Sequence, residues 1–234
     1  MVDVISIHIP KTAGSTAFQA LKKIYSDQEV FVDATPFALD SAGIHEPISL
    51  HCVPMATRII HGHISVDRYN KMFPSAKKIV WVRNPIVRMI SHYFYAQTEE
   101  AIKIAPGQAK MNIIEFANLY KNIMFLMTGG EKLNDFYFVG VTEFFQDDLR
   151  ELLDLLDCST KTNYFNSFNL NSYPGYHDEV IRMLSDKNLI AQLLDINRKD
   201  IQLYQNALNL RANRKGYSDV LEMYQRHLEL TKCK

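Results

Sequence analysis

The chain has 234 residues, with 26 basic and 26 acidic side chains, so its formal net charge is zero. Because no excess positive charge would attract a polyanion, this balance argues against a nucleic-acid-binding protein, and any anion site must be built locally. The length suits one domain spanning residues 1–234. The three cysteines are far apart and match no metal or disulfide spacing, which indicates a reducing compartment (Cys52, Cys158, Cys233).

The hydrophobic pattern predicts strands alternating with helices. We expect strands at 4–9, 30–32, 58–61, 77–83 and 136–141, and helices at 17–25, 65–72, 86–97, 112–126 and 146–156. Residues 99–110 and 160–177 are predicted to be loops, and 177–229 to form two helices that break near 213–216. This alternation predicts an α/β fold with a central parallel sheet flanked by helices.

The loop after the first strand has the features of an anion site. Backbone N–H groups and a helix N-terminus converge there, and both favour a negatively charged ligand. Lys11 adds a positive charge, and Gly14 lets the backbone come close to a ligand. Ser15 and Thr16 add hydroxyl donors and are expected to cap the helix. The structural alternative is an ordinary capped helix with Lys11 in solvent.

The loop differs from the nucleoside triphosphatase pattern, in which lysine follows the last glycine. Here Lys11 precedes Gly14, so the lysine reaches an anion from the strand side. A magnesium-dependent enzyme also needs an aspartate after a second apolar strand, whereas the strand at 77–83 ends in Arg83. Both differences argue against a small-molecule kinase that uses ATP, which is the alternative enzyme. An inactive nucleotide-binding domain is the alternative that is not an enzyme.

Four stretches together resemble the sulfotransferases that use 3′-phosphoadenosine 5′-phosphosulfate (PAPS). They follow one another as in that family: Pro10–Thr16 as the 5′-phosphosulfate loop, His61-Gly62-His63, Val82–Pro85 with Arg88 and Ser91 as the 3′-phosphate element, and Phe138–Glu143 before an amphipathic helix. The pattern is most similar to the carbohydrate group that includes the heparan sulfate 2-O- and 6-O-sulfotransferases.

This resemblance implies a three-layer, P-loop-like α/β fold and the transfer of a sulfuryl group from PAPS to an acceptor hydroxyl without a metal. The product would be adenosine 3′,5′-bisphosphate (PAP). The cofactor-binding loop would comprise Lys11, Thr12, Ala13, Gly14, Ser15 and Thr16. Lys11 would also be catalytic, by stabilising negative charge on the leaving phosphate. Arg83 and Ser91 would hold the 3′-phosphate, and Arg88 is expected to be structural or peripheral.

Two histidines lie at the end of the third predicted strand. An acceptor hydroxyl must lose its proton as it attacks, and imidazole, with an unperturbed pKa near ~6.5, is the usual base. The resemblance implies that His63 is this base and that His61 supports it; the residues alone leave the reverse assignment open. His8 and His51 are expected to be structural. A zinc site formed by His51, His61 and His63 is an alternative, but their spacing fits no familiar pattern.

The acceptor is less defined. The run 122–130 is apolar where many relatives carry polar side chains, and basic residues that would grip a polyanionic glycan are not evident. A sugar, a lipid-linked sugar, a polyketide or another small hydroxyl compound is therefore expected. The resemblance implies that Asn171 and Ser172 lie in a loop that closes over the nucleotide. Glu143 is expected either to orient a loop or the acceptor, or to cap a helix.

The relatives in the Golgi carry a membrane anchor. This chain shows neither a signal peptide nor a stretch approaching the ~20 apolar residues that span a bilayer. We therefore expect a cytoplasmic enzyme, with a trimmed form of an anchored protein as the alternative. The oligomeric state is not predicted.

Overall fold

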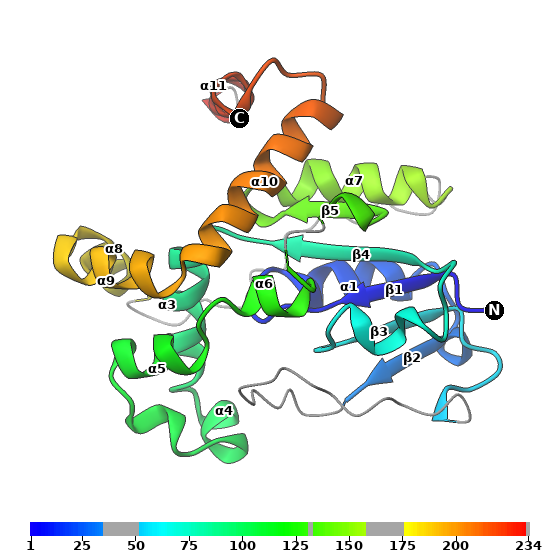
Figure 1. Cartoon of the computed structure of the whole chain (residues 1–234), viewed down its shortest axis with the longest axis horizontal. Helices are drawn as coiled ribbons and strands as arrows, with labels where there is room; N and C mark the ends of the chain where they lie inside the picture. Colours follow the sequence, from blue (N-terminus) through cyan, green and yellow to red (C-terminus); the bar gives the residue numbers. More distant parts are fainter. Residues whose placement is uncertain (35–51, 131–132, 158–175, 233–234) are drawn as a thin grey trace.

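The computed structural model describes residues 1–34, 52–130, 133–157 and 176–232. Five strands form one sheet in the order β2-β3-β1-β4-β5, and every neighbouring pair is parallel (Figure 1). The strands are β1 (Val4–Ile7), β2 (Val30–Asp33), β3 (Ile59–Gly62), β4 (Lys77–Val82) and β5 (Phe138–Val141). Since all five run the same way, their carboxyl ends meet at one edge. This confirms the predicted α/β fold.

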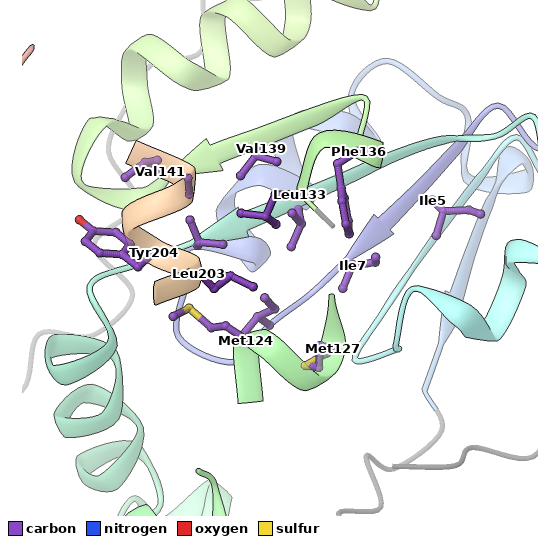
Figure 2. Packing of buried hydrophobic residues seen from close by; sticks show 14 of the residues in the cluster. Ile5, Ile7, Met124, Met127, Leu133, Phe136, Val139, Val141, Leu203 and Tyr204 are labelled. Atoms are coloured by element: carbon purple, nitrogen blue, oxygen red, sulfur yellow. The ribbon is translucent and has the colours of Figure 1, made fainter. Parts of the chain in front are cut away.

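Helices cover both faces of the sheet. On one face, α1 (Gly14–Lys22) and α7 (Phe145–Leu155) pack against Trp81 and other buried strand residues. On the other face, α2 (Asp67–Asn70), α6 (Ile123–Met127) and α10 (Arg198–Arg214) pack against strand residues that include Ile5, Ile7 and Val139. Figure 2 shows Met124, Leu203 and Tyr204 meeting strand side chains on that second face. Burial of β1, β3 and β5 on both sides explains their nearly continuous apolar sequence.

A third group of helices lies beyond the carboxyl ends of the strands (Figure 1). Its members are α3 (Pro85–Tyr95), α4 (Glu99–Ile104), α5 (Ile113–Leu119), α8 (Tyr176–Ser185) and α9 (Lys187–Ile196). α3, α5 and α9 share a small core of their own around Met89, Phe116 and Leu193. The last helix, α11 (Val220–Lys232), packs on α10 through Tyr224, whose hydroxyl lies 3.2 Å from that of Tyr204. Short 3₁₀ turns are Asp27–Glu29, Gln108–Lys110, Leu133–Asp135 and Thr142–Phe144.

The single helix predicted at 112–126 is wrong, because the chain forms α5 and α6 with a break at Asn122. This residue has a left-handed backbone (φ 53°), which asparagine tolerates better than most side chains. Its Oδ1 accepts hydrogen bonds from the Lys199 and Asp200 N–H groups in the first turn of α10. In return, the Asp200 carboxylate accepts from the Met124 and Phe125 N–H groups of α6. Each helix start thus caps the other.

Two further predictions are corrected. Residues 99–110 are not only loop, since Thr98 accepts a hydrogen bond from the Ala101 N–H group and starts α4. The region 177–229 contains four helices rather than two, because Asp186 caps α9 and Asn197 ends it. Thr98 and Asp186 act as side-chain caps, which set the start of each helix independently of the apolar pattern.

Candidate active site

The predicted site residues gather where β3, β1 and β4 end. The loop after β1 carries Lys11, the end of β3 carries His61 and His63, and Arg83 directly follows β4. These three strands are neighbours in the sheet, with β1 in the middle. In open α/β sheets, ligands bind outside the carboxyl ends of the strands, where crossovers leave in opposite directions. β1 is such a point here, since the chain continues from it to β2 on one side and β4 lies on the other.

Neighbouring strands hold the carbonyl groups of the loop. Arg83 Nη1 donates a hydrogen bond to the Lys11 carbonyl at 3.1 Å, and the Thr142 hydroxyl lies 2.9 Å from the Thr12 carbonyl. Because C=O and N–H point in opposite directions in a trans peptide, the next two N–H groups, those of Thr12 and Ala13, face away from these partners. Lys11 (φ 67°) and Ala13 (φ 63°) have left-handed backbones, a strained geometry for residues other than glycine. The surrounding contacts hold the loop in a shape suited to an anion.

Lys11 is the charged side chain of this loop. Burial, and then the nearby charge of Arg83, lowers its pKa to about 8. Its ammonium group lies 4.6 Å from the centroid of the Tyr95 ring on α3, a cation–π contact. Since both causes disfavour the charged form, a bound anion beside Lys11 and Arg83 would restore the usual protonation.

The remaining loop residues divide between structural and exposed positions. The Thr12 hydroxyl is buried and donates to the Ile9 carbonyl at 2.9 Å, so it holds the loop rather than facing a ligand. The expectation that Ser15 or Thr16 caps the helix is wrong, because Ala13 is the N-cap and makes no side-chain cap. Ser15 is exposed, and both hydroxyls belong to the first turn of α1. The early N–H groups of this helix have no partner within it, as at any helix start.

The start of α3 is fixed from two sides. Asn84 Oδ1 accepts hydrogen bonds from the Ile86 and Val87 N–H groups, and Pro85 occupies the first helical position. The Asn84 N–H group donates to Glu143 Oε1 at 2.8 Å. Glu143 therefore contacts the segment that leads into α3, which agrees with the expected role of orienting a loop.

Three buried polar side chains of α3 have unsatisfied atoms. Among the described residues, the Arg88 guanidinium nitrogens, Ser91 Oγ and His92 Nδ1 have no hydrogen-bond partner. Arg88 is fully buried, which lowers its pKa to about 10, while the charge of Asp200 opposes and that of Arg83 adds to this shift. Arg88 and Ser91 lie three positions apart and therefore share a face of the helix. Unpaired buried groups of this kind are costly unless a ligand or water satisfies them.

His92 was not identified from the sequence. Burial lowers its pKa well below the usual value, and the charges of Arg88, Lys11 and His63 lower it further. Since Lys11 and His63 act on its pKa, His92 lies near the predicted site residues. The only sequence signal was its position directly after Ser91 on a predicted site helix.

The two predicted histidines make different hydrogen bonds. His63 Nδ1 lies 2.6 Å from the His8 carbonyl, and His61 Nδ1 lies 2.9 Å from Ser6 Oγ. Because a carbonyl only accepts, His63 must donate from Nδ1, which leaves Nε2 as the acceptor of a neutral ring. Burial lowers the pKa of His63 and, more strongly, that of His61, to about 3. Both rings are therefore neutral near pH 7.

His8 was expected to be structural, but its ring lies among the site residues. It stacks on His63 with 4.3 Å between ring centroids and approaches His61 at 5.0 Å. Its edge also fills the space beside Gly14. The sequence signal for its place was its position just after β1, where polar side chains of parallel sheets meet ligands.

Some expectations lie outside the described residues, namely Asn171, Ser172 and His51. Within the described ranges, no three His, Cys, Asp or Glu side chains are arranged to hold a metal ion. Over the same ranges, no helix combines the length and apolar character needed to cross a bilayer.

The geometry thus places the predicted anion loop and a neutral imidazole at the same edge of an α/β sheet. A model of the sulfotransferase family matches residues 3–206, which is most of the chain. The chain therefore belongs to the sulfotransferase family, whose members are transferases of sulfuryl groups. The coarser form of the sequence prediction is confirmed.

Other comparisons add little. No curated protein matches the chain. Among solved structures, the crystal structure of a sulfotransferase from Alicyclobacillus acidocaldarius is similar at 14% identity and a TM-score of 0.37. The match covers 88% of this chain and 99% of that one. At such a score, the likeness supports neither the fold nor the activity beyond what the strands and the family match establish.

Proposed function

We propose that this protein transfers a sulfuryl group from PAPS to the hydroxyl group of a sugar or another small compound and releases PAP. The observation that carries the proposal is the joint position of Lys11, Arg83 and the His63 imidazole at the ends of three adjacent strands. The two cationic side chains suit a donor that carries two separate anionic groups, and the imidazole suits an acceptor that must lose a proton.

The donor fits the polar groups of the loop and of α3. The Thr12 and Ala13 N–H groups and the Lys11 ammonium would hold the 5′ phosphosulfate. Arg83, with its planar fork, and Ser91, whose buried hydroxyl has no partner in the described part of the chain, would hold the 3′-phosphate. When bound, PAPS supplies the sulfuryl group. Lys11 stabilises the negative charge that develops on the leaving phosphate oxygen, and it does so more in the transition state than in the ground state.

His63 is the proposed base. Its Nδ1 donates to the His8 carbonyl, so Nε2 is free to accept the proton of an acceptor hydroxyl. After proton transfer, the imidazolium keeps this hydrogen bond, now charge-assisted and stronger. His61 Nδ1 is tied to Ser6 and its ring is buried, which supports a positioning role beside His63.

The finer assignments are also part of the proposal. A carbohydrate acceptor like those of the heparan sulfate enzymes, a cytoplasmic location and a metal-free mechanism remain predictions from sequence. So does the single domain spanning residues 1–234.

Calorimetric titration tests the donor site. We expect PAP to bind wild-type protein with micromolar affinity, more tightly than ATP with magnesium, and to lose most of this affinity in Arg83→Ala. Arg150→Ala is the matched control, because Arg150 is an exposed arginine that pairs with Asp147 on α7. Preference for ATP with magnesium would instead favour a kinase.

Turnover tests the base. With an acceptor found by screening small hydroxyl compounds against labelled PAPS, His63→Ala should abolish transfer while PAP affinity changes little. Tight PAP binding with no transfer to any acceptor would favour the inactive binding domain. Loss of PAP binding in His63→Ala would show that its role is in the donor site.

A further inference from the structure

Four aromatic rings form a column that ends at the proposed base. Phe18 of α1 stacks on His61 with 3.9 Å between centroids and an interplanar angle of 5°. His61 lies 5.0 Å from His8, and His8 stacks on His63 at 4.3 Å and 25°. The column therefore runs from the helix after the loop, across β3 and β1, to His63.

His8 contacts both the proposed base and the first residue of α1. Its backbone carbonyl holds His63 Nδ1 at 2.6 Å, and its ring face covers the His63 ring. Its Cδ2 edge lies so close to Gly14 that a methyl group there would be 2.2 Å away. A side chain on Gly14 and the ring of His8 cannot occupy this space together. The missing side chain of Gly14 thus leaves room for the ring beside His63.

The ring of His8 is neutral. Burial lowers its pKa well below the usual value, and the neighbouring His63, His61 and Lys11 lower it further. Beyond His8, the titratable and charged groups coupled to His63 are His61 on the same strand end and His92 on α3. A neutral aromatic face attracts a cation placed over it, and most strongly where water is excluded.

We infer that His8 is a positioning residue for sulfuryl transfer, whose neutral ring face stabilises His63 as the imidazolium that forms when His63 takes the acceptor proton. The inference rests on the proposed role of His63 as base. No covalent step involves His8: the proton moves from the acceptor oxygen to His63 Nε2, and the new S–O bond replaces the S–O bond to the leaving phosphate. The ring is needed only as a π-face.

Three variants separate a π-face from mere packing. His8→Phe keeps an aromatic face, His8→Leu keeps apolar bulk without one, and Phe18→Leu removes the ring at the far end of the column as a matched control. The first measurement is the titration of the His63 imidazole, followed by nuclear magnetic resonance in full-length protein labelled at histidine and assigned with His63→Gln. The second is kcat and acceptor KM for each variant.

We expect His8→Leu to lower the pKa of His63 by about one unit relative to His8→Phe and to reduce kcat by roughly 10-fold with little change in KM. His8→Phe should stay within about 3-fold of wild type, and Phe18→Leu should leave the His63 titration unchanged. If His8→Phe does not fold, the comparison of His8→Leu with Phe18→Leu still decides.

Equal titrations of His63 in His8→Leu and His8→Phe, or in His8→Leu and Phe18→Leu, would overturn the inference. This failure is distinct from failure of the proposed function. The titration needs no turnover, and a His63→Ala variant that still transferred sulfuryl groups would reject His63 as base, whatever His8 does.

Discussion

Gly14 offers a sharp test of the site geometry. It is the first residue of α1, where replacing glycine by alanine normally favours the helix by up to ~1 kcal/mol. Here the new methyl group would lie 2.2 Å from His8 Cδ2 and 2.8 Å from Nε2. Carbon atoms pack at ~3.5–4.0 Å, so the ring must move by more than about 1 Å. Gly14→Ala should therefore destabilise the protein.

The size of the effect follows from overpacking, which costs about 1–3 kcal/mol. After the helix gain is subtracted, the free energy of unfolding should fall by roughly 1–2 kcal/mol. For a chain of this length, this corresponds to a decrease in Tm of about 2–8 °C. Scanning calorimetry and urea unfolding both measure it. Because the same displacement changes the position of the ring relative to His63, transfer should fall as well.

Gly107→Ala is the control. Gly107 has φ −66° and ψ −28°, and nothing lies within 4 Å of a Cβ placed there. This change should leave stability unchanged or raise it by about 0.4–1 kcal/mol. Adding His8→Ala to Gly14→Ala should cost less than the sum of the two single changes, because it removes the colliding ring. A Gly14→Ala protein as stable as Gly107→Ala would refute this account of the loop.

Three other predictions concern stability measured by urea unfolding. Asn122→Gly should cost about 1 kcal/mol through the lost cap of α10, and Asn122→Ala about 1 kcal/mol more because its backbone is left-handed; equal costs would contradict this. Arg211→Met should cost about 3 kcal/mol, because it removes the closer of two arginines paired with the buried carboxylate of Asp148 (Arg211 Nε at 2.7 Å) and leaves Arg214 at 3.7 Å; a cost below 1 kcal/mol would contradict it. Burial lowers the pKa of His61 to about 3, so below about pH 6.5 the unfolded chain binds a proton at His61 that the folded chain does not bind. The free energy of unfolding should therefore fall by about 1.4 kcal/mol per pH unit from pH 6.5 towards 3, and this group should have no effect on it above pH 6.5. If the dependence of the unfolding free energy on pH were unchanged in His61→Phe, His61 would not be its origin.

The sheet could be predicted because local sequence determines it. The runs at β1 and β4 are apolar and β-branched, and burial on both faces makes such runs continuous rather than alternating. The alternation of strands with helices then limits the topology to parallel crossovers. Helix boundaries were less predictable where distant groups decide them. Asn122 breaks a continuous apolar pattern, and its partners lie on α10, 77 and 78 positions along the chain.

The candidate site shows the same division. Lys11, Arg83 and His63 lie at strand ends, so their meeting follows from the parallel sheet alone. His92 was missed, and the full burial of Arg88 was not predicted, because sequence spacing gives a helix face but not what that face packs against. Burial lowers both pKa values first, and charges from other parts of the chain then act on them: Asp200 on Arg88, and Lys11 on His92.

The strand end predicts the position of His8, but not its contacts. Its place after β1 put it at the ligand edge of the sheet, yet its contacts come from Gly14, six residues later, and from His63, 55 residues later. A glycine after a phosphate-binding strand is usually read as room for the ligand. In this chain, the imidazole ring of His8 fills the space beside Gly14. The loop that would hold the donor and the ring that would take the acceptor proton are therefore packed through one side chain, so a change at either end of this contact should alter both stability and transfer.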